Sequence, residues 1–439
     1  MLYPTFKITK PIRLIELFAG YGSQALALKY LGVEFEHWKI CEWAIKSIQA
    51  YKDIHFPNGY HPAGVMDIPK EEIVDFLYEK GISNNYNEPM TLEQIKRLKE
   101  DDLYTIYENI YVTNNLVNIQ QVKGEDLEIV DQDKFTYLLT YSFPCQDLSL
   151  AGTRKLMSDT STRSGMLWEV ERILLECKEI GTLPDVLLME NVPQVHGEGA
   201  IEDFNKWQLR LEQLGYKNYW QDLIATDYGI PQTRNRTFMV SILGDYNYTF
   251  PKPIPLKLKL KDMLEDEVDE KYYLSDKMKQ YIFSEDDKYK VNKNSLKLNR
   301  EIACSKTTRE GWTRADTSDY IIDNIGNKSL QETLQKNEIK DTCYIDTYNK
   351  RIDEEKSGTI TTGVSFRNNT FLADSDLRIR KLTPKECFRL MGVKDEDYDK
   401  VAKNQSDSSL YHLAGDSIVV NVLMAIFGEM IDDNKRVNE

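Results

Sequence analysis

The fold is indicated first by residues 13–24, which read Arg13-Leu14-Ile15-Glu16-Leu17-Phe18-Ala19-Gly20-Tyr21-Gly22-Ser23-Gln24. The first six residues are mostly apolar and predict a buried strand, a tight glycine turn follows, and residues 25–31 predict a helix. Glycines in such a turn let the backbone approach a nucleotide-like ligand closely. The turn also fits the GxGxxA form of the dinucleotide fingerprint. We therefore expect a nucleotide-binding unit here.

Acidic and aromatic residues follow the next two predicted segments. A second strand over residues 35–41 ends at Glu42, and an acid at that distance from the glycine turn can accept hydrogen bonds from ribose hydroxyls. Trp43 offers a ring face for an adenine. A short segment over residues 64–68 brings Asp67 to the same ligand. The sequence thus predicts an adenosine site.

Strand and helix patterns alternate up to residue 243, which predicts a doubly wound parallel sheet of the α/β class. An inserted, acidic helical region is expected over about residues 69–133, with helices at 71–78 and 92–107. Pro251, Pro253 and Pro255 mark a linker, residues 257–371 lack a regular period, and helical periodicity returns over 380–393 and 417–430. We expect a main domain at 1–244, a smaller, irregular domain at 245–377, and a segment at 378–439 that returns to the first.

The charge is unevenly distributed along the chain. The net charge is −15, yet residues 288–314 hold eight basic and two acidic side chains, whereas residues 70–133 hold six basic and fifteen acidic ones. Such asymmetry permits polyanion binding on one face. Six scattered cysteines without a CxxC pair indicate a reducing compartment and neither disulfides nor a metal site. No secretory signal or membrane span is recognised, so we expect a cytoplasmic protein.

A candidate nucleophile follows the apolar run at residues 137–141. Pro144 ends this strand and presents Cys145 at a rigid corner beyond its carboxyl end, where ligands bind in open α/β sheets. Glu190 leaves the carboxyl end of another buried strand. Arg234 and Arg236 alternate in a strand-like segment and are expected to point to one face. A thiolate, a proton-holding carboxyl and a cationic donor form a set for nucleophilic catalysis.

The motifs together resemble those of the DNA (cytosine-5-)-methyltransferases over nearly the whole chain. Six of them match in the family's order: Glu16-Leu17-Phe18-Ala19-Gly20-Tyr21-Gly22, Phe143-Pro144-Cys145-Gln146, Glu190-Asn191-Val192, Gln232-Thr233-Arg234-Asn235-Arg236, Arg380-Lys381-Leu382-Thr383-Pro384-Lys385-Glu386-Cys387 and Gly415-Asp416-Ser417-Ile418. The insertion after Asp67 and the sequence from Leu139 to Cys145 are similar to those of the mollicute-type CpG methyltransferases. The resemblance implies a Rossmann-like, S-adenosylmethionine-dependent methyltransferase domain with a smaller target-recognition domain.

The resemblance also implies a role for each matching residue. Cys145 would attack C6 of a flipped-out cytosine, Glu190 would engage N3 and the exocyclic amine, and Arg236 with Arg234 would hold O2. The matching positions that would line the S-adenosylmethionine pocket are Phe18, Gly20, Gly22, Glu42, Trp43, Asp67, Ile68, Pro144, Leu167 and Ser417. Asp416 stands where the family usually has asparagine, and Leu413 where it usually has glutamine. No metal is implied.

The expected partner is double-stranded DNA. The polar loop over residues 146–163 would close over the flipped base, with Gln146, Ser149 and Arg163 as contacts. In the second domain, loops at 304–314 and 358–369 are expected to meet the bases or phosphates through Lys306, Arg309, Arg314, Thr359 and Arg367. We expect a monomer that belongs to a restriction-modification system, is phage-encoded or is an orphan methylase; a cognate endonuclease would act separately.

Three other functions remain open on the sequence. A nicotinamide-dependent dehydrogenase would explain the glycine turn and Glu42, but leaves the Phe-Pro-Cys-Gln and arginine motifs unexplained. An RNA cytosine methyltransferase would share the fold, although the large segment at 245–377 favours a duplex-reading domain. A catalytically inactive DNA-binding module is the third, because of Asp416.

Overall fold

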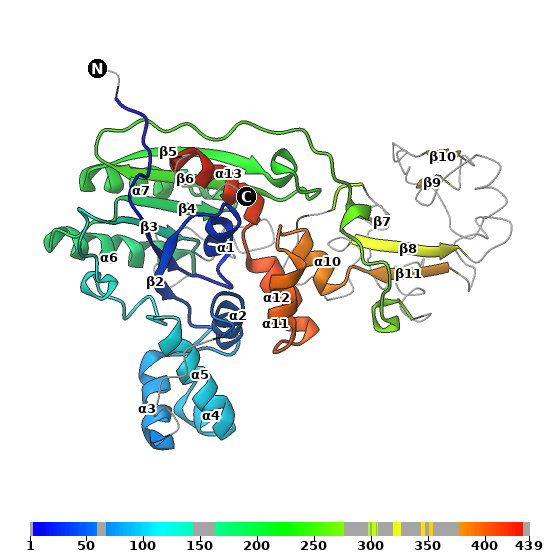
Figure 1. The fold of residues 1–439 in the computed structure, drawn as a ribbon, viewed down its shortest axis with the longest axis horizontal. Coiled ribbons are helices and arrows are strands. Elements are labelled where there is room, and N and C mark those ends of the chain that lie inside the picture. Colours follow the sequence, from blue (N-terminus) through cyan, green and yellow to red (C-terminus); the bar gives the residue numbers. More distant parts are fainter. Residues whose placement is uncertain are drawn as a thin grey trace.

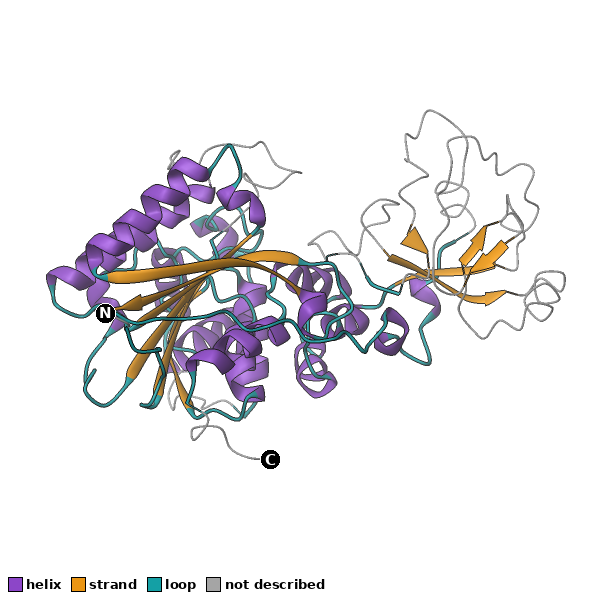
Figure 2. Cartoon of the chain, turned by 90° about the horizontal axis from the view of Figure 1, so that it is seen from above, coloured by secondary structure: helices purple, strands orange, loops and turns teal. Residues whose placement is uncertain are grey.

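The computed structural model describes residues 3–58, 67–143, 163–275, 297–298, 301–303, 305, 319–325, 344–346, 351–353 and 377–432. The described chain forms a large lobe around one sheet and a smaller, strand-containing lobe beside it (Figure 1). Figure 2 shows the strands of the smaller lobe set apart from the main sheet.

The large lobe is built on a six-stranded sheet of order β2-β1-β3-β4-β6-β5. Its strands are β1 (Ile12–Leu17), β2 (Phe35–Cys41), β3 (Thr136–Tyr141), β4 (Val186–Asn191), β5 (Tyr216–Ile224) and β6 (Asn235–Leu243). The four strands β2, β1, β3 and β4 pair in parallel, which confirms the α/β class. They therefore present their carboxyl ends at one edge.

One strand departs from the parallel sheet predicted from the sequence. β6 lies between β4 and β5 and is antiparallel to both. β5 and β6 are joined through the short helical turn η5 (Ala225–Tyr228) with no crossover helix, and a short connection can only join antiparallel neighbours. The strand direction is reversed exclusively at β6, so the sheet is mixed, and the amino end of β6 lies beside the carboxyl end of β4.

Helices cover both faces of this sheet. Neighbouring strand residues alternate between two apolar clusters, with Leu138 and Leu188 in one and Leu139 and Leu187 in the other. The first cluster includes α1 (Ser23–Tyr30) and the C-terminal helices α10 (Pro384–Arg389), α11 (Asp395–Ala402), α12 (Asp407–Asp416) and α13 (Val420–Met430). The second includes α6 (Leu167–Glu179) and α7 (Ile201–Leu214). The sheet is thus buried on both sides, as the continuous apolar runs of its strands require.

Between β2 and β3 the chain forms α2 (Ile45–His55) and then three helices with an apolar cluster of their own, α3 (Lys70–Lys80), α4 (Leu92–Lys96) and α5 (Glu100–Val112). The prediction of a single helix over 92–107 is wrong, because α4 ends at Lys96 and α5 begins at Glu100. Thr91 and Gln94 form a capping box that begins α4, and three acidic residues in the first turn of α5 favour a second helix start. Figure 1 shows the three helices projecting from one end of the large lobe.

The described part of the smaller lobe contains two small sheets. β8 (Asp319–Ile325) lies between β7 (Lys297–Leu298) and β11 (Leu377–Lys381), and β9 (Tyr344–Asp346) pairs with β10 (Arg351–Asp353). After β11, residues Pro384–Met430 return to the large lobe, where α13 packs on α1. One described stretch, 407–430, is long and apolar enough to cross a membrane, but 72% of the tested window is buried in this core.

Candidate active site

A carboxylate, a guanidinium and a hydroxyl meet at the carboxyl edge of the sheet. Glu190, the next-to-last residue of strand β4, accepts a hydrogen bond from the Ser142 hydroxyl at 2.6 Å. Its other carboxylate oxygen lies 3.1 Å from Nε of Arg236, on β6. The side chain of Glu190 is 7% exposed and that of Arg236 is 18% exposed, so the ion pair is largely shielded from water. The antiparallel β4–β6 pairing brings these residues together, although 46 positions separate them in the chain.

The same contacts fix the segment that leads to the predicted nucleophile. Ser142 and Phe143 directly follow β3, and Asn191 Nδ2 donates to the Phe143 carbonyl at 3.0 Å. The chain is therefore tied to β4 twice just before Pro144. Cys145, Pro144, Gln146 and Ser149 lie outside the described residues, so the position of the thiol stays a prediction.

Arg234 has a different environment from Arg236. It is 4% exposed, and its Nη2 donates to the carbonyls of Gly415 at 3.0 Å and Ser417 at 2.7 Å. The expectation that both arginines point to one place is therefore corrected. Arg234 lies directly before β6 and binds the C-terminal segment. Arg236 lies within β6 and binds Glu190.

The glycine turn has the backbone that its sequence predicts. Phe18, Gly20 and Gly22 have φ values of 60°, 56° and 82°, in the left-handed region that favours glycine. A Cβ built on Gly20 would meet no atom within 4 Å, so the turn faces open space at this position. This open space would let a ligand approach the backbone at Gly20 closely.

Glu42 lies against the turn from β2. Its carboxylate accepts hydrogen bonds from the backbone N–H of Gly20 at 2.9 Å and of Ala44 at 2.8 Å. Burial raises the pKa of Glu42 to about 7, although these hydrogen bonds lower it, and the nearby Asp416 carboxylate raises it further. Because each carboxylate oxygen can accept two hydrogen bonds, Glu42 retains capacity for ribose hydroxyls. The open space at Gly20 and this acceptor both fit an adenosine cofactor.

The other predicted cofactor residues that the structure describes come from separate parts of the chain. Leu167 is buried at the start of α6, and Ser417 is buried where α12 ends. Trp43 and Ile68 are partly buried against the cluster of α3–α5, and Asp67 is exposed. The structure thus joins parts of the chain that are far apart in sequence.

The sequence analysis missed several polar residues that support the site. Ser142 and Asn191 bind the strand ends; the signal in the sequence is a polar residue that directly follows or ends an apolar run. His412 was also missed; its Nε2 lies 3.0 Å from Asp416 Oδ2, and its ring lies 4.0 Å from that of Tyr86. Tyr86 belongs to the region between α3 and α4, so that region contacts the C-terminal segment near Glu42.

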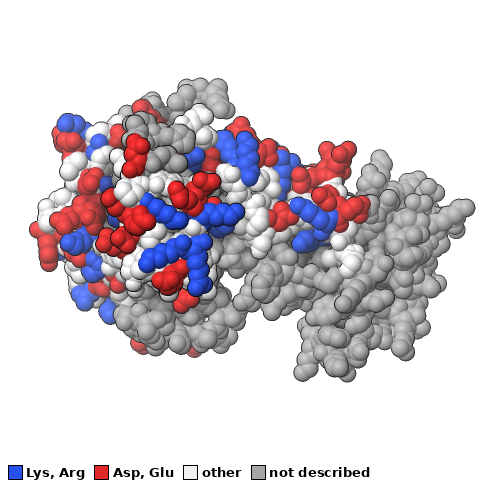
Figure 3. All heavy atoms as spheres, turned by 90° about the horizontal axis from the view of Figure 1, so that it is seen from below, with Lys and Arg blue, Asp and Glu red and all other residues white. Residues whose placement is uncertain are grey.

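The predicted DNA contacts are mostly not described. Lys306, Arg309, Arg314, Thr359 and Arg367 lie outside the described residues, and Arg163 begins the short helix η3 (Arg163–Met166) without a described side chain. On the face in Figure 3, acidic and basic side chains of the described residues are intermingled. Within the described chain no group of three His, Cys, Asp or Glu side chains is arranged to hold a metal ion.

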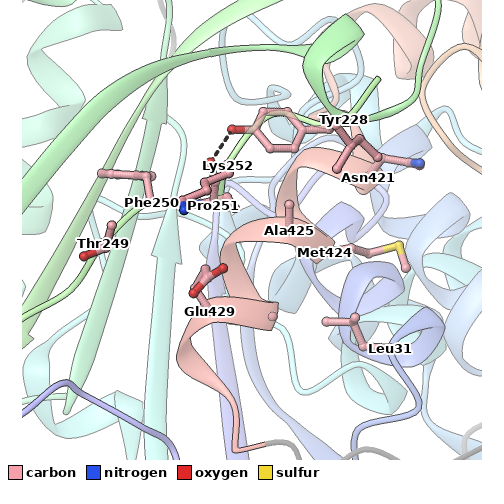
Figure 4. Close-up of a pocket in the computed structure, with 12 residues that line it drawn as sticks. Leu31, Tyr228, Thr249, Phe250, Pro251, Lys252, Asn421, Met424, Ala425 and Glu429 are labelled. Atoms are coloured by element: carbon pink, nitrogen blue, oxygen red, sulfur yellow. Dashed lines mark hydrogen bonds between the residues drawn. The ribbon is translucent and has the colours of Figure 1, made fainter. Parts of the chain in front are cut away.

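A separate cavity of about 680 Å³ lies where residues 249–254 pass α13 (Figure 4). Tyr228 donates to the Pro251 carbonyl at its rim, and Leu31, Met424 and Ala425 supply apolar walls. None of the predicted catalytic or cofactor residues lines it. It is therefore not the site described above.

Comparisons with known proteins show the family of this chain. The family model described as C-5 cytosine-specific DNA methylase matches residues 93–432. The Type II methyltransferase M2.ScrFI of Lactococcus lactis subsp. cremoris is 33% identical to this chain. The alignment covers 95% of this chain and 99% of that relative. The orphan methyltransferase M.SssI of Spiroplasma monobiae is 32% identical, over 96% and 98%. The S. pombe Dnmt2 methyltransferase structure has the same fold, with a TM-score of 0.55 at 15% identity, over 94% of this chain and 96% of that one.

Proposed function

Because the chain belongs to the C-5 cytosine-specific DNA methylase family, we propose that it methylates C5 of a cytosine flipped out of duplex DNA through a covalent adduct with Cys145. The observation that carries this mechanism is the contact of Ser142, Glu190 and Arg236 at the edge of the sheet. Ser142 lies in the segment that leads directly to Pro144 and Cys145. The methyl donor is S-adenosylmethionine, which supplies an electrophilic methyl group when bound.

The residues of the group have separate tasks in this proposal. The Cys145 thiolate attacks C6, and a new S–C bond forms while electron density moves toward C5 and N3. A carboxyl at Glu190, held by Ser142 and Arg236, hydrogen-bonds N3 and the exocyclic amine and supports protonation of the ring. Arg236 binds O2 and favours the thiolate by its charge. Once C5 carries the methyl group, its proton passes to water, the electrons of the C5–H bond re-form the C5–C6 double bond, and Cys145 leaves as a thiolate, which releases 5-methylcytosine.

The cofactor is held at the glycine turn. Glu42 accepts hydrogen bonds from the ribose, the backbone at Gly20 allows close approach, and Trp43 stacks on the adenine. Ser417, held through Arg234, closes the site from the C-terminal segment. We also propose that residues 245–377 read the DNA sequence and that the enzyme acts as a monomer.

The relatives leave two biological settings for this activity. One relative is named a Type II methyltransferase and the other an orphan methyltransferase. The protein therefore either protects DNA against a separately acting endonuclease or modifies DNA without one. A genome neighbourhood with or without an endonuclease gene distinguishes these settings.

Bisulfite sequencing of DNA from cells that express the chain tests the activity, the target base and its sequence context together. We expect 5-methylcytosine in one defined context, and its loss in Cys145→Ser. The matched control is Cys177→Ala, which removes a buried thiol in α6 and should keep methylation. Trapping on duplex DNA that contains 5-fluorocytosine should depend on Cys145, and a preference for tRNA over duplex DNA would contradict the proposal.

A further inference from the structure

A chain of buried hydrogen bonds lies beneath the glycine turn. The Tyr51 hydroxyl, on α2, lies 2.6 Å from Glu16 Oε2 and 2.9 Å from Nδ1 of His37 on β2. The other oxygen of Glu16 accepts a hydrogen bond from the backbone N–H of Ala25 in the first turn of α1. Glu16 and Tyr51 are both fully buried. These hydrogen bonds thus link β2, α2, the end of β1 and the start of α1.

A second residue of α2 contacts the turn itself. Nε2 of His55 lies 3.0 Å from the carbonyl oxygen of Tyr21, between the two glycines. A Cβ on Gly22 would lie 2.4 Å from this Nε2 and 2.6 Å from the Tyr51 ring. The rings of Tyr51 and His55 lie 4.5 Å apart and together form the floor on which Gly22 packs.

The direction of each hydrogen bond follows from the partners. A carbonyl oxygen only accepts, so Nε2 of His55 carries the proton. Tyr51 donates its single proton to Oε2 of Glu16, so Nδ1 of His37 donates to the Tyr51 oxygen. Burial lowers the pKa of His37 to about 4 and lowers that of His55 well below its usual value, which keeps both rings neutral at neutral pH.

These contacts support a backbone that is unfavourable by itself. Phe18 has a φ of 60°, which a residue with a side chain adopts rarely, and its neighbours Gly20 and Gly22 are also left-handed. Two backbone hydrogen bonds hold it, from the Gly22 N–H to the Ala19 carbonyl at 2.9 Å and from the Phe18 N–H to the Cys41 carbonyl at 2.8 Å. The Glu42 carboxylate, which binds the Gly20 N–H, and His55 of α2, which binds the Tyr21 carbonyl, add to these bonds.

We propose that Tyr51 and His55 are positioning residues that preform the glycine turn for the S-adenosylmethionine of the proposed function. They act on the cofactor through the backbone of residues 18–22, and neither is required for the chemistry at the cytosine. This inference rests on the proposed function, because it assumes that the turn binds the cofactor.

The test compares Tyr51→Phe, which keeps the ring and removes the hydroxyl, with His55→Met, which removes the donor. The Kd of S-adenosylhomocysteine is measured by calorimetry without DNA, and kcat and the two KM values are measured on duplex DNA. We expect the Kd and the KM for S-adenosylmethionine to rise about tenfold, as for the loss of a buried hydrogen bond, with kcat and the KM for DNA within about twofold.

Two further variants separate positioning from general destabilisation. His55→Gln keeps an N–H donor at a similar reach and should restore most of the affinity. Tyr216→Phe removes another buried hydroxyl, which donates to the Pro184 carbonyl away from the turn, and should leave the affinity unchanged. Unchanged cofactor affinity in Tyr51→Phe and His55→Met, or equal loss in Tyr216→Phe, would overturn the inference. Absence of cofactor binding and methyl transfer in the unaltered protein would instead refute the proposed function.

Discussion

Replacing Arg234 by methionine should weaken the fold and the binding of S-adenosylmethionine, with a small effect on the chemical step. The guanidinium is 4% exposed and donates two hydrogen bonds, at 2.7 and 3.0 Å, to carbonyls at the end of α12. Methionine fills the space of the Arg234 stem, but it ends two bonds short of the Nη atoms and has no hydrogen-bond donor. The main loss is therefore the pair of charge-assisted hydrogen bonds between the start of β6 and the C-terminal segment.

The magnitude follows from these two contacts. A hydrogen bond from a charged donor contributes roughly 1.5–3 kcal/mol, and the lower cost of burying methionine offsets part of the sum. We expect the free energy of unfolding to fall by about 3 kcal/mol. For a chain of 439 residues, whose unfolding entropy is roughly 0.9 kcal/mol/K, that corresponds to a Tm lower by about 3 °C. Because Ser417 would lose its anchor, the KM for S-adenosylmethionine should rise about tenfold.

The assay combines thermal unfolding with steady-state kinetics, and Arg236→Lys is the matched variant. Lysine keeps a positive charge beside Glu190 but cannot reproduce the guanidinium geometry. We expect Arg236→Lys to lower kcat by about 10²–10³-fold with a nearly unchanged Tm. If Arg234→Met instead lowers kcat at saturating cofactor as much as Arg236→Lys does, with no loss of stability, the separation of the two arginines is refuted.

Three further predictions concern stability and can be measured by urea unfolding. Gly22→Ala should cost about 3 kcal/mol, because its Cβ would meet His55 at 2.4 Å, whereas Gly20→Ala, with open space, should cost only about 1 kcal/mol of backbone strain; equal costs would contradict this. Burial raises the pKa of Glu16 from 4.5 to about 7, so the folded state binds more protons between these values and stability falls as the pH rises through them. Glu16→Gln should therefore gain up to about 3 kcal/mol relative to the unaltered protein between pH ~4.5 and ~7.5, and a constant difference would exclude this protonation. Arg380→Met leaves the fully buried Glu386 carboxylate without its bidentate partner and should cost about 3–5 kcal/mol, part of which the additional change Glu386→Gln should recover.

The large lobe illustrates how far local patterns reach. The apolar run of β1 and the glycines after it predicted a strand and a tight turn; both are present, and the turn is left-handed at Phe18, Gly20 and Gly22. Glu42 was predicted, from its distance along the chain, to bind the same ligand as that turn. Its carboxylate contacts Gly20, because consecutive strands of a β-α-β unit lie side by side. These predictions depend on residues close in sequence.

Two predictions were wrong because the apolar period alone does not fix where a helix ends or which way a strand runs. A helical period continues through residues 92–107, but the capping box at Thr91 and the acidic start of α5 divide it into two helices. Alternating strand and helix patterns predicted a parallel sheet, yet the direction of β6 depends on its connection to β5 through η5. Periodicity carries no information about strand direction.

The sequence by itself determined the family, the class of fold and the residue types of the site, because motifs and apolar periods are local properties of the chain. The tertiary structure decided which side chains meet. Arg234 and Arg236 are two positions apart, yet one binds the segment at 415–417, about 180 residues later, and the other binds Glu190. A guanidinium takes the acceptor that packing brings within reach, and that choice is made only when β4, β6 and the end of α12 converge at one edge of the sheet.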